Sequence, residues 1–254
     1  MAHAATLQES DMTNLAHRTI LLTGAGRANG IGQATIRALL AAGADRVVAT
    51  VRAPGQLATL QGEHPGRIDE VVIDLTNATA IAALPAQTGP IHVLINNAGV
   101  FTADTALGEG EGEAMWAVNY LAPKRLVRAY ASSLAQGAVV NVNSVAGLIN
   151  FPICAVYSDT KAALHSLTVA QRRELHSQGT QVLGVYPGPI ETDMAKGVPF
   201  PTTAPAVVAE AIVAALQENT LEVFPDPMAQ QIAAAVIQDR QALERSFWPA
   251  AATA

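Results

Sequence analysis

Short runs rich in valine and isoleucine alternate along this chain with longer stretches of helical spacing, and this alternation constrains the fold most strongly. Runs of this kind are typical of strands buried on both faces, and the helices between them provide the crossovers that parallel strands need. We expect strands at 18–23, 46–51, 69–74, 91–96, 138–143, 181–186 and 221–224, and helices at 31–42, 76–84, 111–135, 156–177 and 204–217. The sequence therefore predicts an α/β fold, a single doubly wound Rossmann-type domain with a mainly parallel sheet of about seven strands.

The composition allows one large core and argues against several kinds of partner. Of the 254 residues, 50% are hydrophobic and 14% are charged, and the formal net charge is −6. No run of Lys or Arg is present to bind nucleic acid or an anionic membrane, and the apolar runs are shorter than the about 18 residues of a membrane-spanning helix. The single cysteine excludes an internal disulfide and favours a reducing compartment, so we expect a cytoplasmic protein.

Neither repeats nor linkers divide the chain. Residues 1–17 lack the basic start and apolar stretch of a secretory signal, and we expect a flexible arm there. The Rossmann-fold domain should then span 18–248, followed by a C-terminal tail at 249–254. Near the end, Asp226 and Pro227 form a favourable helix start, and apolar residues follow at helical spacing. We expect that helix to pack into the core or to contact another subunit.

The segment TGAGRANGIG, residues 23–32, follows the first expected strand and opens the first expected helix. Backbone N–H groups at a helix start bind pyrophosphate, and glycine allows the backbone to approach it closely. The interval between Gly24 and Gly30 is longer than in the commonest form of such a loop. We expect the extra length to bulge outward and to carry Arg27 toward the adenosine end of a bound dinucleotide, while the phosphate turn stays intact.

The second expected strand ends at Arg52 and has no acid at its end. Folds that bind NAD usually place an acid there for the ribose 2′-OH, whereas a 2′-phosphate needs a cation. Arg52 can pair with such a phosphate through charge-assisted hydrogen bonds, and the alternative is an arginine that is only solvated. We therefore expect NADP as the cofactor, with Arg52 and Arg27 at its adenosine end.

The fifth expected strand is followed in sequence by three residues whose side chains are suited to proton transfer. Ser144 follows that strand, and Tyr157 and Lys161 lie four residues apart on the next expected helix. Residues with this spacing share one face of a helix, so both side chains project into the same cleft. A nearby ammonium favours tyrosinate and typically lowers a pKa by about 1–3 units. We expect the pKa of Tyr157 to fall toward neutral pH, which makes the phenol a usable acid or base.

The ordered set of motifs resembles the short-chain dehydrogenase/reductase family. The match runs through TGAGRANGIG, DLT with Asp74, NNAG (96–99), Asn119 in AVNY, Ser144, YSDTK and YPGPIET (186–192), and it spans residues 18 to about 225. The spacing of the glycine loop is similar to the enoyl-carrier-protein reductase branch of the family. That branch separates its tyrosine and lysine by a longer interval, so we do not expect enoyl reduction.

The resemblance implies a role for each matched residue. Tyr157 would exchange a proton with the substrate oxygen, and Ser144 would hold that oxygen. Lys161 would bind the nicotinamide ribose and bias Tyr157, while Asn119 would hold a water that links Lys161 to solvent. Asp74 would lie near the adenine. The other implied cofactor contacts are Gly24, Gly30, Ile31, Gly32, Leu75, Asn97, Ala98, Gly99, Pro187, Gly188, and, at the nicotinamide carboxamide, Ile190 and Thr192.

The segments expected to line the substrate pocket are apolar. The expected substrate contacts are Ser144, Ala146, Phe151, Cys154, Tyr157 and Met194, with Leu148, Ile149, Ile153, Val198 and Phe200 also available and Lys196 as the one cation. A hydrophobic ketone or aldehyde, or the matching secondary alcohol in reverse, suits this lining. The alternative for Cys154 is a small buried side chain without a substrate role.

Two other functions remain open. A 3-oxoacyl-carrier-protein reductase would want a basic mouth for its acidic carrier, which the net charge disfavours. A catalytically silent NADP-binding sensor or scaffold would not need the complete set of Ser144, Tyr157, Lys161 and Asn119. The six histidines have no zinc-ligand spacing, so no metal is expected. By family analogy, the helices expected on either side of Ser144 pair subunits into a homodimer or homotetramer.

Overall fold

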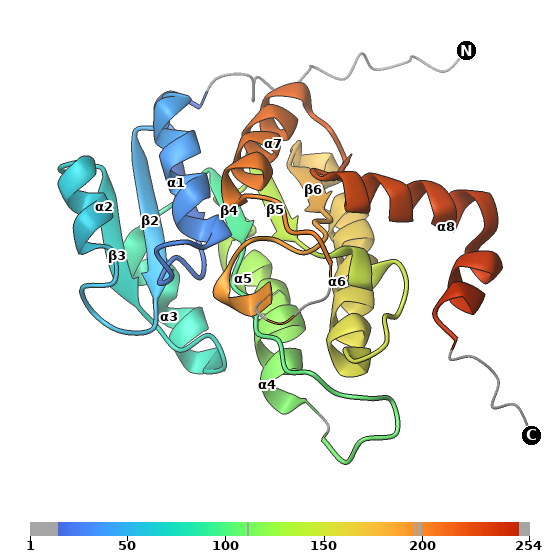
Figure 1. Ribbon diagram of the computed structural model, residues 1–254. Coiled ribbons are helices and arrows are strands. Elements are labelled where there is room, and N and C mark those ends of the chain that lie inside the picture. Colours follow the sequence, from blue (N-terminus) through green and yellow to red (C-terminus); the bar gives the residue numbers. More distant parts are fainter. Residues whose placement is uncertain (1–14, 111, 196, 198–199, 249–254) are drawn as a thin grey trace, which may run out of the picture.

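The computed structural model describes residues 15–110, 112–195, 197 and 200–248, and within them the seven expected strands form one sheet. The strand order is β3-β2-β1-β4-β5-β6-β7, and every neighbouring pair is parallel. The strands are β1 (Thr19–Leu22), β2 (Arg46–Val51), β3 (Ile68–Val72), β4 (Val93–Asn96), β5 (Ala138–Val142), β6 (Gln181–Val185) and β7 (Glu222–Val223). Figure 1 shows this sheet with helices on both sides, which confirms the doubly wound α/β fold.

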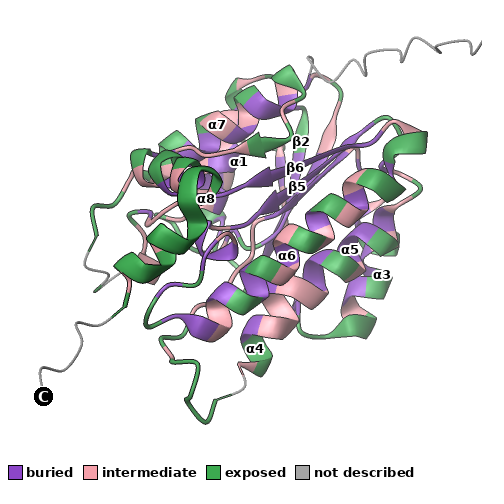
Figure 2. Ribbon diagram, turned by 90° about the vertical axis from the view of Figure 1, so that its right-hand side faces the viewer, coloured by how far each residue is buried: buried purple, intermediate pink, exposed green. Residues whose placement is uncertain are grey.

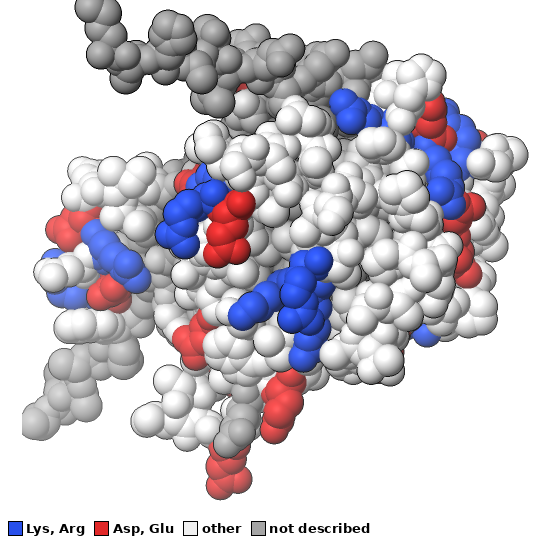
Figure 3. All heavy atoms as spheres, turned by 180° about the vertical axis from the view of Figure 1, so that it is seen from behind, with Lys and Arg blue, Asp and Glu red and all other residues white. Residues whose placement is uncertain are grey.

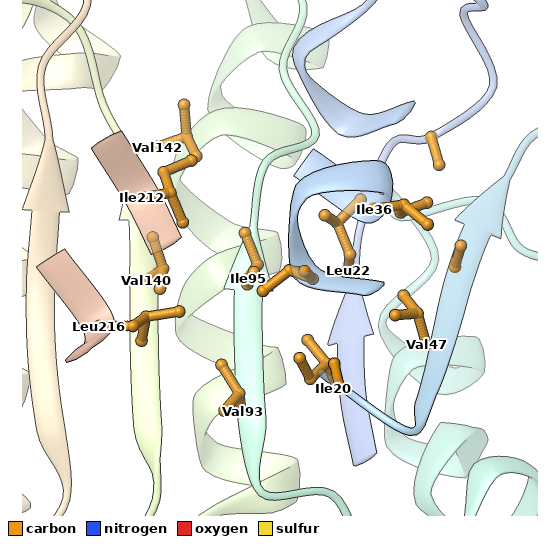
Figure 4. Packing of buried hydrophobic residues seen from close by; sticks show 14 of the residues in the cluster. Ile20, Leu22, Ile36, Val47, Val93, Ile95, Val140, Val142, Ile212 and Leu216 are labelled. Carbon is orange, nitrogen blue, oxygen red and sulfur yellow. The ribbon is translucent and has the colours of Figure 1, made fainter. Parts of the chain in front are cut away.

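Each central strand contributes to two hydrophobic cores, because successive side chains of a strand point to opposite faces of the sheet. Ile20 and Leu22 of β1 pack in one apolar cluster with Ile36 (Figure 4). Leu21, between them in sequence, belongs to the cluster on the other face together with Leu94 of β4. The central strands are therefore mostly apolar on both faces, which explains why they appear in the sequence as Val/Ile/Leu-rich runs.

Two layers of helices cover the sheet (Figure 2). The helices on one face are α1 (Ile31–Ala41), α2 (Ala58–Glu63) and α7 (Pro205–Glu218). The helices on the other face are α3 (Ala78–Thr88), α5 (Ala122–Tyr130) and α6 (Ala155–Glu174). Because the strands are parallel, their carboxyl ends lie at one edge of the sheet, and the loops at that edge form the expected ligand site.

The helix expected at 111–135 has an irregular first half. It consists of α4 (Glu113–Met115), a π-helical turn (Trp116–Leu121) and then α5. Such turns are rare and occur frequently at functional sites. Asn119 lies inside this turn and is buried.

The helix that was expected to start at Pro227 is α8 (Pro227–Ser246), and it bends within its length. The Asp226 side chain accepts a hydrogen bond from Ala229 N (2.9 Å) and caps the first half. Asp239 has non-helical backbone angles (φ −159°, ψ 87°), and its Oδ1 accepts a hydrogen bond from Ala242 N (2.9 Å) at the start of the second half. The chain turns there (Figure 1), and Phe247 follows the end of α8.

The packed part of the chain begins before the expected boundary at residue 18. Leu15 is fully buried in the same core cluster as β1, so the last residues of the expected arm belong to the domain. The rest of that arm (1–14) and the expected tail (249–254) lie outside the described residues. No helix within the described part of the chain combines the length and apolar character that crossing a membrane requires.

Candidate active site

The glycine loop forms a turn that tolerates no side chain at its first glycine. Gly24 has a φ of +76°, and a Cβ built on it would lie 2.6 Å from the Cα of Ala98. Thr50 of β2 holds the turn, because its backbone oxygen accepts from Ala25 N (2.9 Å) and its Oγ1 accepts from Gly24 N (3.2 Å). The helix α1 then begins after Gly30 with no side-chain cap, which suits the binding of an anion at its first turn.

Asn97 supports the glycine loop from the neighbouring strand end. Its Nδ2 donates to the backbone oxygens of Thr23 (2.8 Å) and Gly24 (3.1 Å). A Cβ at Gly32 would lie 2.9 Å from the same Nδ2. The sequence predicted Asn97 and Ala98 only as lining of the cofactor cleft. Their contacts give both residues a structural part in shaping the phosphate turn.

Both arginines expected at the adenosine end are exposed. The inserted residues form a compact turn in which Gly30 N donates to the backbone oxygen of Arg27 (3.0 Å). Within the described ranges, no carboxylate pairs with Arg27 or Arg52. A glycine turn that a Cβ would fill, next to a strand end with an unpaired arginine, fits a dinucleotide that carries a 2′-phosphate.

Asp74 is exposed just after β3, whereas its neighbour Leu75 is buried. The Oδ1 atom of Asp74 accepts hydrogen bonds from Thr76 N (2.9 Å) and Thr76 Oγ1 (2.8 Å). These bonds hold the pKa of the Asp74 carboxyl below its usual value, because they stabilise the ionised form. The contact of Asp74 with adenine stays a prediction.

The structure brings Ser144, Tyr157 and Lys161 together beyond the end of β5. Ser144 lies close enough to Tyr157 to influence the pKa of its phenol, and its Oγ accepts from Ala146 N (3.1 Å) and donates to Pro187 O (3.4 Å). Lys161 is almost fully buried, and its Nζ donates to the backbone oxygen of Val142 (3.0 Å). The same Nζ lies over the Tyr157 ring, 5.6 Å from its centroid.

The expected lowering of the Tyr157 pKa is wrong. Burial raises the pKa of Tyr157 to about 12, and the influence of Ser144 only partly opposes this. Burial also lowers the pKa of Lys161 to about 8. The sequence placed the two side chains on one helical face correctly. It did not show that Lys161 Nζ would bind the backbone oxygen of Val142 and face the Tyr157 ring. Nor did it show that burial would change the pKa of Tyr157 more than the nearby cation does.

Asn119 connects the end of β4 to α6. Its Oδ1 accepts from Val100 N (2.9 Å), and its Nδ2 donates to Val100 O (3.0 Å) and Thr160 Oγ1 (3.1 Å). Gly99 lies between Asn119 and Lys161, because a Cβ on it would be 3.6 Å from Asn119 Oδ1 and 4.0 Å from Lys161 Nζ. The role of Asn119 in holding a water stays a prediction.

The loop after β6 is held by an acid whose role the sequence did not reveal. Asp226 is only 2% exposed, and its Oδ2 accepts from Gly188 N (2.8 Å) while its Oδ1 caps α8. A Cβ at Gly188 would lie 2.8 Å from Oδ1. In the same loop, Pro187 O accepts from Val145 N (3.1 Å), and Ile190 forms a parallel bridge with Thr203. The sequence predicted Asp226 only as a helix start, but it also fixes this loop.

The substrate side of the site is an apolar cluster. Its buried members are Val145, Ala146, Ile149, Phe151, Cys154, Ala229 and Ile232, and Phe101, Tyr157, Phe224, Met228, Val236, Leu243 and Phe247 pack against it. The rings of Phe101 and Tyr157 meet edge to face at 5.3 Å, and those of Phe151 and Phe247 lie 5.0 Å apart. Phe101 and Phe247 were missed. Phe101 lies two residues after the NNAG motif, which is a signal that could have found it. Nothing near Phe247 in sequence marks it.

The other residues expected on this side differ in exposure. Met194 is partly buried, whereas Ile153 (54% exposed, φ +67°) and Phe200 (43% exposed) face solvent. Lys196 and Val198 lie outside the described residues. Burial raises the pKa of the Cys154 thiol, and its Sγ contacts Phe151 O and Ser158 Oγ at 3.6 Å each. These contacts are those of a small buried side chain.

The charged side chains on the face of α3, α5 and α6 stand in small groups of both signs, with wide uncharged areas between them (Figure 3). In the part of the chain that the structure describes, no three His, Cys, Asp or Glu side chains gather as a metal site would require.

Comparison with known proteins identifies the relatives of this chain. The sequence model of the short chain dehydrogenase family matches residues 18–200. Carbonyl reductase (NADPH) 2 of Sus scrofa is 34% identical over 184 residues, 70% of this chain and 74% of that protein. Ketoacyl reductase HetN of Nostoc sp. is 32% identical over 231 residues, 84% and 80% of the two chains. A short chain dehydrogenase from Burkholderia cenocepacia, solved in complex with NADP, superposes with a TM-score of 0.86 at 34% identity over 93% of this chain and 99% of that chain.

Proposed function

This chain belongs to the short-chain dehydrogenase family, and we propose that it transfers a hydride between NADP(H) and a hydrophobic ketone or aldehyde, or the secondary alcohol in reverse. The observation that carries this proposal is the meeting of Ser144, Tyr157 and Lys161 beside an apolar cluster. Reduction of a carbonyl group requires a proton donor, a hydrogen-bond donor and a cation beside the reacting atoms. These three groups lie here at one wall of an apolar site.

Tyr157 is the proton donor in this proposal. Because burial raises the pKa of Tyr157 to about 12, the phenol stays protonated at neutral pH and can give its proton to a carbonyl oxygen. The Ser144 hydroxyl, which lies beside Tyr157, would orient the same oxygen. When bound, NADPH supplies the hydride. The protonated phenol is the form that reduction of a carbonyl group uses, and the reverse oxidation uses the phenolate.

The cofactor is NADP(H) rather than NAD(H). Arg52 at the end of β2 and Arg27 in the glycine loop are exposed cations without an acidic partner in the described part of the chain. The relatives support the choice, since the Burkholderia structure contains NADP and the porcine reductase is named for NADPH. Lys161 would bind the nicotinamide ribose. Gly24, Gly30 and Gly32 would surround the pyrophosphate.

The substrate class follows from the cluster around Phe151. Its lining is apolar and aromatic, which favours a hydrophobic carbonyl compound. A second candidate is reduction of a 3-oxoacyl chain, which the similarity to ketoacyl reductase HetN favours. A catalytically silent sensor is the weakest alternative, because binding of NADP(H) alone does not require Ser144 and Tyr157 to lie together.

We further propose a cytoplasmic homodimer or homotetramer. The pairing helices would be α5 and α6, by analogy with the family.

The test is an NADPH-oxidation assay with hydrophobic ketones, aldehydes and 3-oxoacyl thioesters, on the wild type and on Tyr157→Phe. Loss of the general acid should reduce turnover by about 10²–10⁴ while NADPH affinity, measured by fluorescence titration, stays nearly unchanged. Turnover of Tyr157→Phe equal to wild type would refute the assigned mechanism. Binding of NADPH without turnover of any carbonyl compound would instead favour the sensor.

A further inference from the structure

The side chain of Gln56 fills the space between the glycine loop and the end of β2. Its Oε1 accepts hydrogen bonds from Arg52 N (3.0 Å) and Ala53 N (3.1 Å). A Cβ built on Gly26 would lie 2.6 Å from this Oε1 and 3.0 Å from Nε2. The carboxamide therefore rests against the backbone of the glycine loop, and only glycine at position 26 leaves room for it.

The hydrogen bonds of Gln56 fix which amide atom is which. The backbone groups of Arg52 and Ala53 that face the side chain are N–H donors, so the atom between them must be the oxygen. That oxygen already accepts two hydrogen bonds. No acceptor for Nε2 exists among the residues that the structure describes, so both of its N–H groups remain for a ligand.

Two further side chains hold Gln56 in this position. The carboxylate of Glu70 on β3 accepts the N–H groups of both sequence neighbours of Gln56, at 2.6 and 2.8 Å. Gln33 of α1, only 3% exposed, donates from Nε2 to Ala25 O (3.1 Å) and to Gln56 O (3.3 Å). The turn is therefore tied both to the sheet and to the glycine loop before any ligand binds, which reduces the entropy lost on binding.

We propose that Gln56 recognises the 2′-phosphate of NADP(H) through Nε2, an inference that rests on the function proposed above. The adenosine end of a dinucleotide is held between the glycine loop and the end of β2 in this fold, which is where Gln56 lies. There the protein offers the N–H groups of Gln56 and the guanidinium of Arg52, all of them donors. A phosphate accepts from such groups.

The same arrangement explains why a free ribose 2′-OH is the poorer ligand. A 2′-OH needs an acceptor for its proton, which NAD-binding folds supply as an acid. The two candidate acceptors near this turn, Gln56 Oε1 and the carboxylate of Glu70, are already engaged by backbone N–H groups. The acid on β3 stabilises the turn and lies within that strand, not at the end of β2, where NAD-binding folds place the acid for the ribose.

The experiment compares NADP+ and NAD+ binding by calorimetry for the wild type and Gln56→Glu. The glutamate keeps an oxygen for Arg52 and Ala53 but replaces the donor Nε2 by a second acceptor. We expect NADP+ affinity to fall by about tenfold to a hundredfold, with NAD+ affinity unchanged or higher and an unchanged melting temperature without nucleotide. An NADP+/NAD+ affinity ratio equal to wild type would mean that Gln56 only stabilises the turn, and the proposal would be overturned.

The matched control is Thr59→Glu, which adds the same charge at an exposed position of α2. Its affinity ratio should stay close to wild type. If Thr59→Glu weakens NADP+ as much as Gln56→Glu does, the effect is general electrostatic repulsion and the contact with Nε2 is refuted. The wild type alone tests the cofactor proposal, because equal affinity for NAD+ and NADP+ would overturn both proposals before any variant is measured.

Discussion

Substitution of Gly24 by alanine tests the close approach on which the phosphate turn depends. An L-residue in the left-handed region, here at φ +76°, costs about 1–2 kcal/mol. The new Cβ would lie 2.6 Å from the Cα of Ala98, so the backbone after β4 must move, which adds about 1–3 kcal/mol. We expect a total loss of stability of about 3 kcal/mol, or about 6–12 °C in melting temperature for a chain of this size.

The matched control is Gly66→Ala. Gly66 has nearly the same backbone conformation (φ +74°), but a Cβ there would meet nothing within 4 Å. It should therefore lose only the conformational contribution of about 1–2 kcal/mol. Its affinity for NADPH should equal that of wild type, whereas Gly24→Ala should bind NADPH much more weakly because its phosphate turn is displaced.

The measurements are thermal unfolding followed by circular dichroism and NADPH titration followed by fluorescence. Equal losses of melting temperature for Gly24→Ala and Gly66→Ala would show that contact with Ala98 carries no cost. Unchanged NADPH affinity in Gly24→Ala would show that the geometry of this turn does not control cofactor binding. Either result would refute the reasoning from the close approach.

Two further predictions concern the other parts of the site. Burial lowers the pKa of Lys161 from 10.5 to about 8, so between these pH values the unfolded chain binds more protons than the folded one, and the contribution of Lys161 to stability rises with pH across that window. Urea denaturation of the cofactor-free protein should show this rise, and Lys161→Met should lack it; an identical pH dependence in both proteins would contradict the burial argument. Phe247→Ala should raise KM for bulky hydrophobic ketones more than for small ones and leave the Kd of NADPH unchanged, because the Phe247 ring packs on Phe151 at the substrate side. Steady-state kinetics with ketones of increasing size measures this difference. An equal change of KM for all of these ketones would rule this role out.

The strands were predictable because burial on both faces favours apolar residues at successive positions, as in Ala138–Val140 of β5, where every residue is buried. The short helix α2 was not, because six residues give too little periodicity. The proximity of Tyr157 and Lys161 could be predicted from their spacing, since residues four apart share a helical face. The pKa of Tyr157 could not, because it depends on how completely distant segments exclude water. The second role of Asp226, a hydrogen bond across 38 residues of sequence, is equally invisible to local patterns.

The roles of Gln56 and Glu70 belong to the same class of missed features. Both are polar residues near the surface, and in sequence they resemble ordinary solvated side chains. Their function arises only when β3 pairs with β2 and brings Glu70 beside the turn. Sequence spacing predicts contacts within one helix or strand, but these contacts join three separate elements.

The bend of α8 makes the number of residues in its second half decide which side chain packs beside Phe151. The second half of α8 lies beyond residues 18–200, the part that matches the family, and follows the part of the helix that Asp226 ties to the loop after β6. The second half of α8 restarts at Asp239, and each residue of a helix turns the chain by about 100°. One residue added or removed between Asp239 and Phe247 would rotate a different side chain toward Phe151. A change in helix phase would therefore alter the apolar cluster beside Tyr157 without any substitution among the buried members of that cluster.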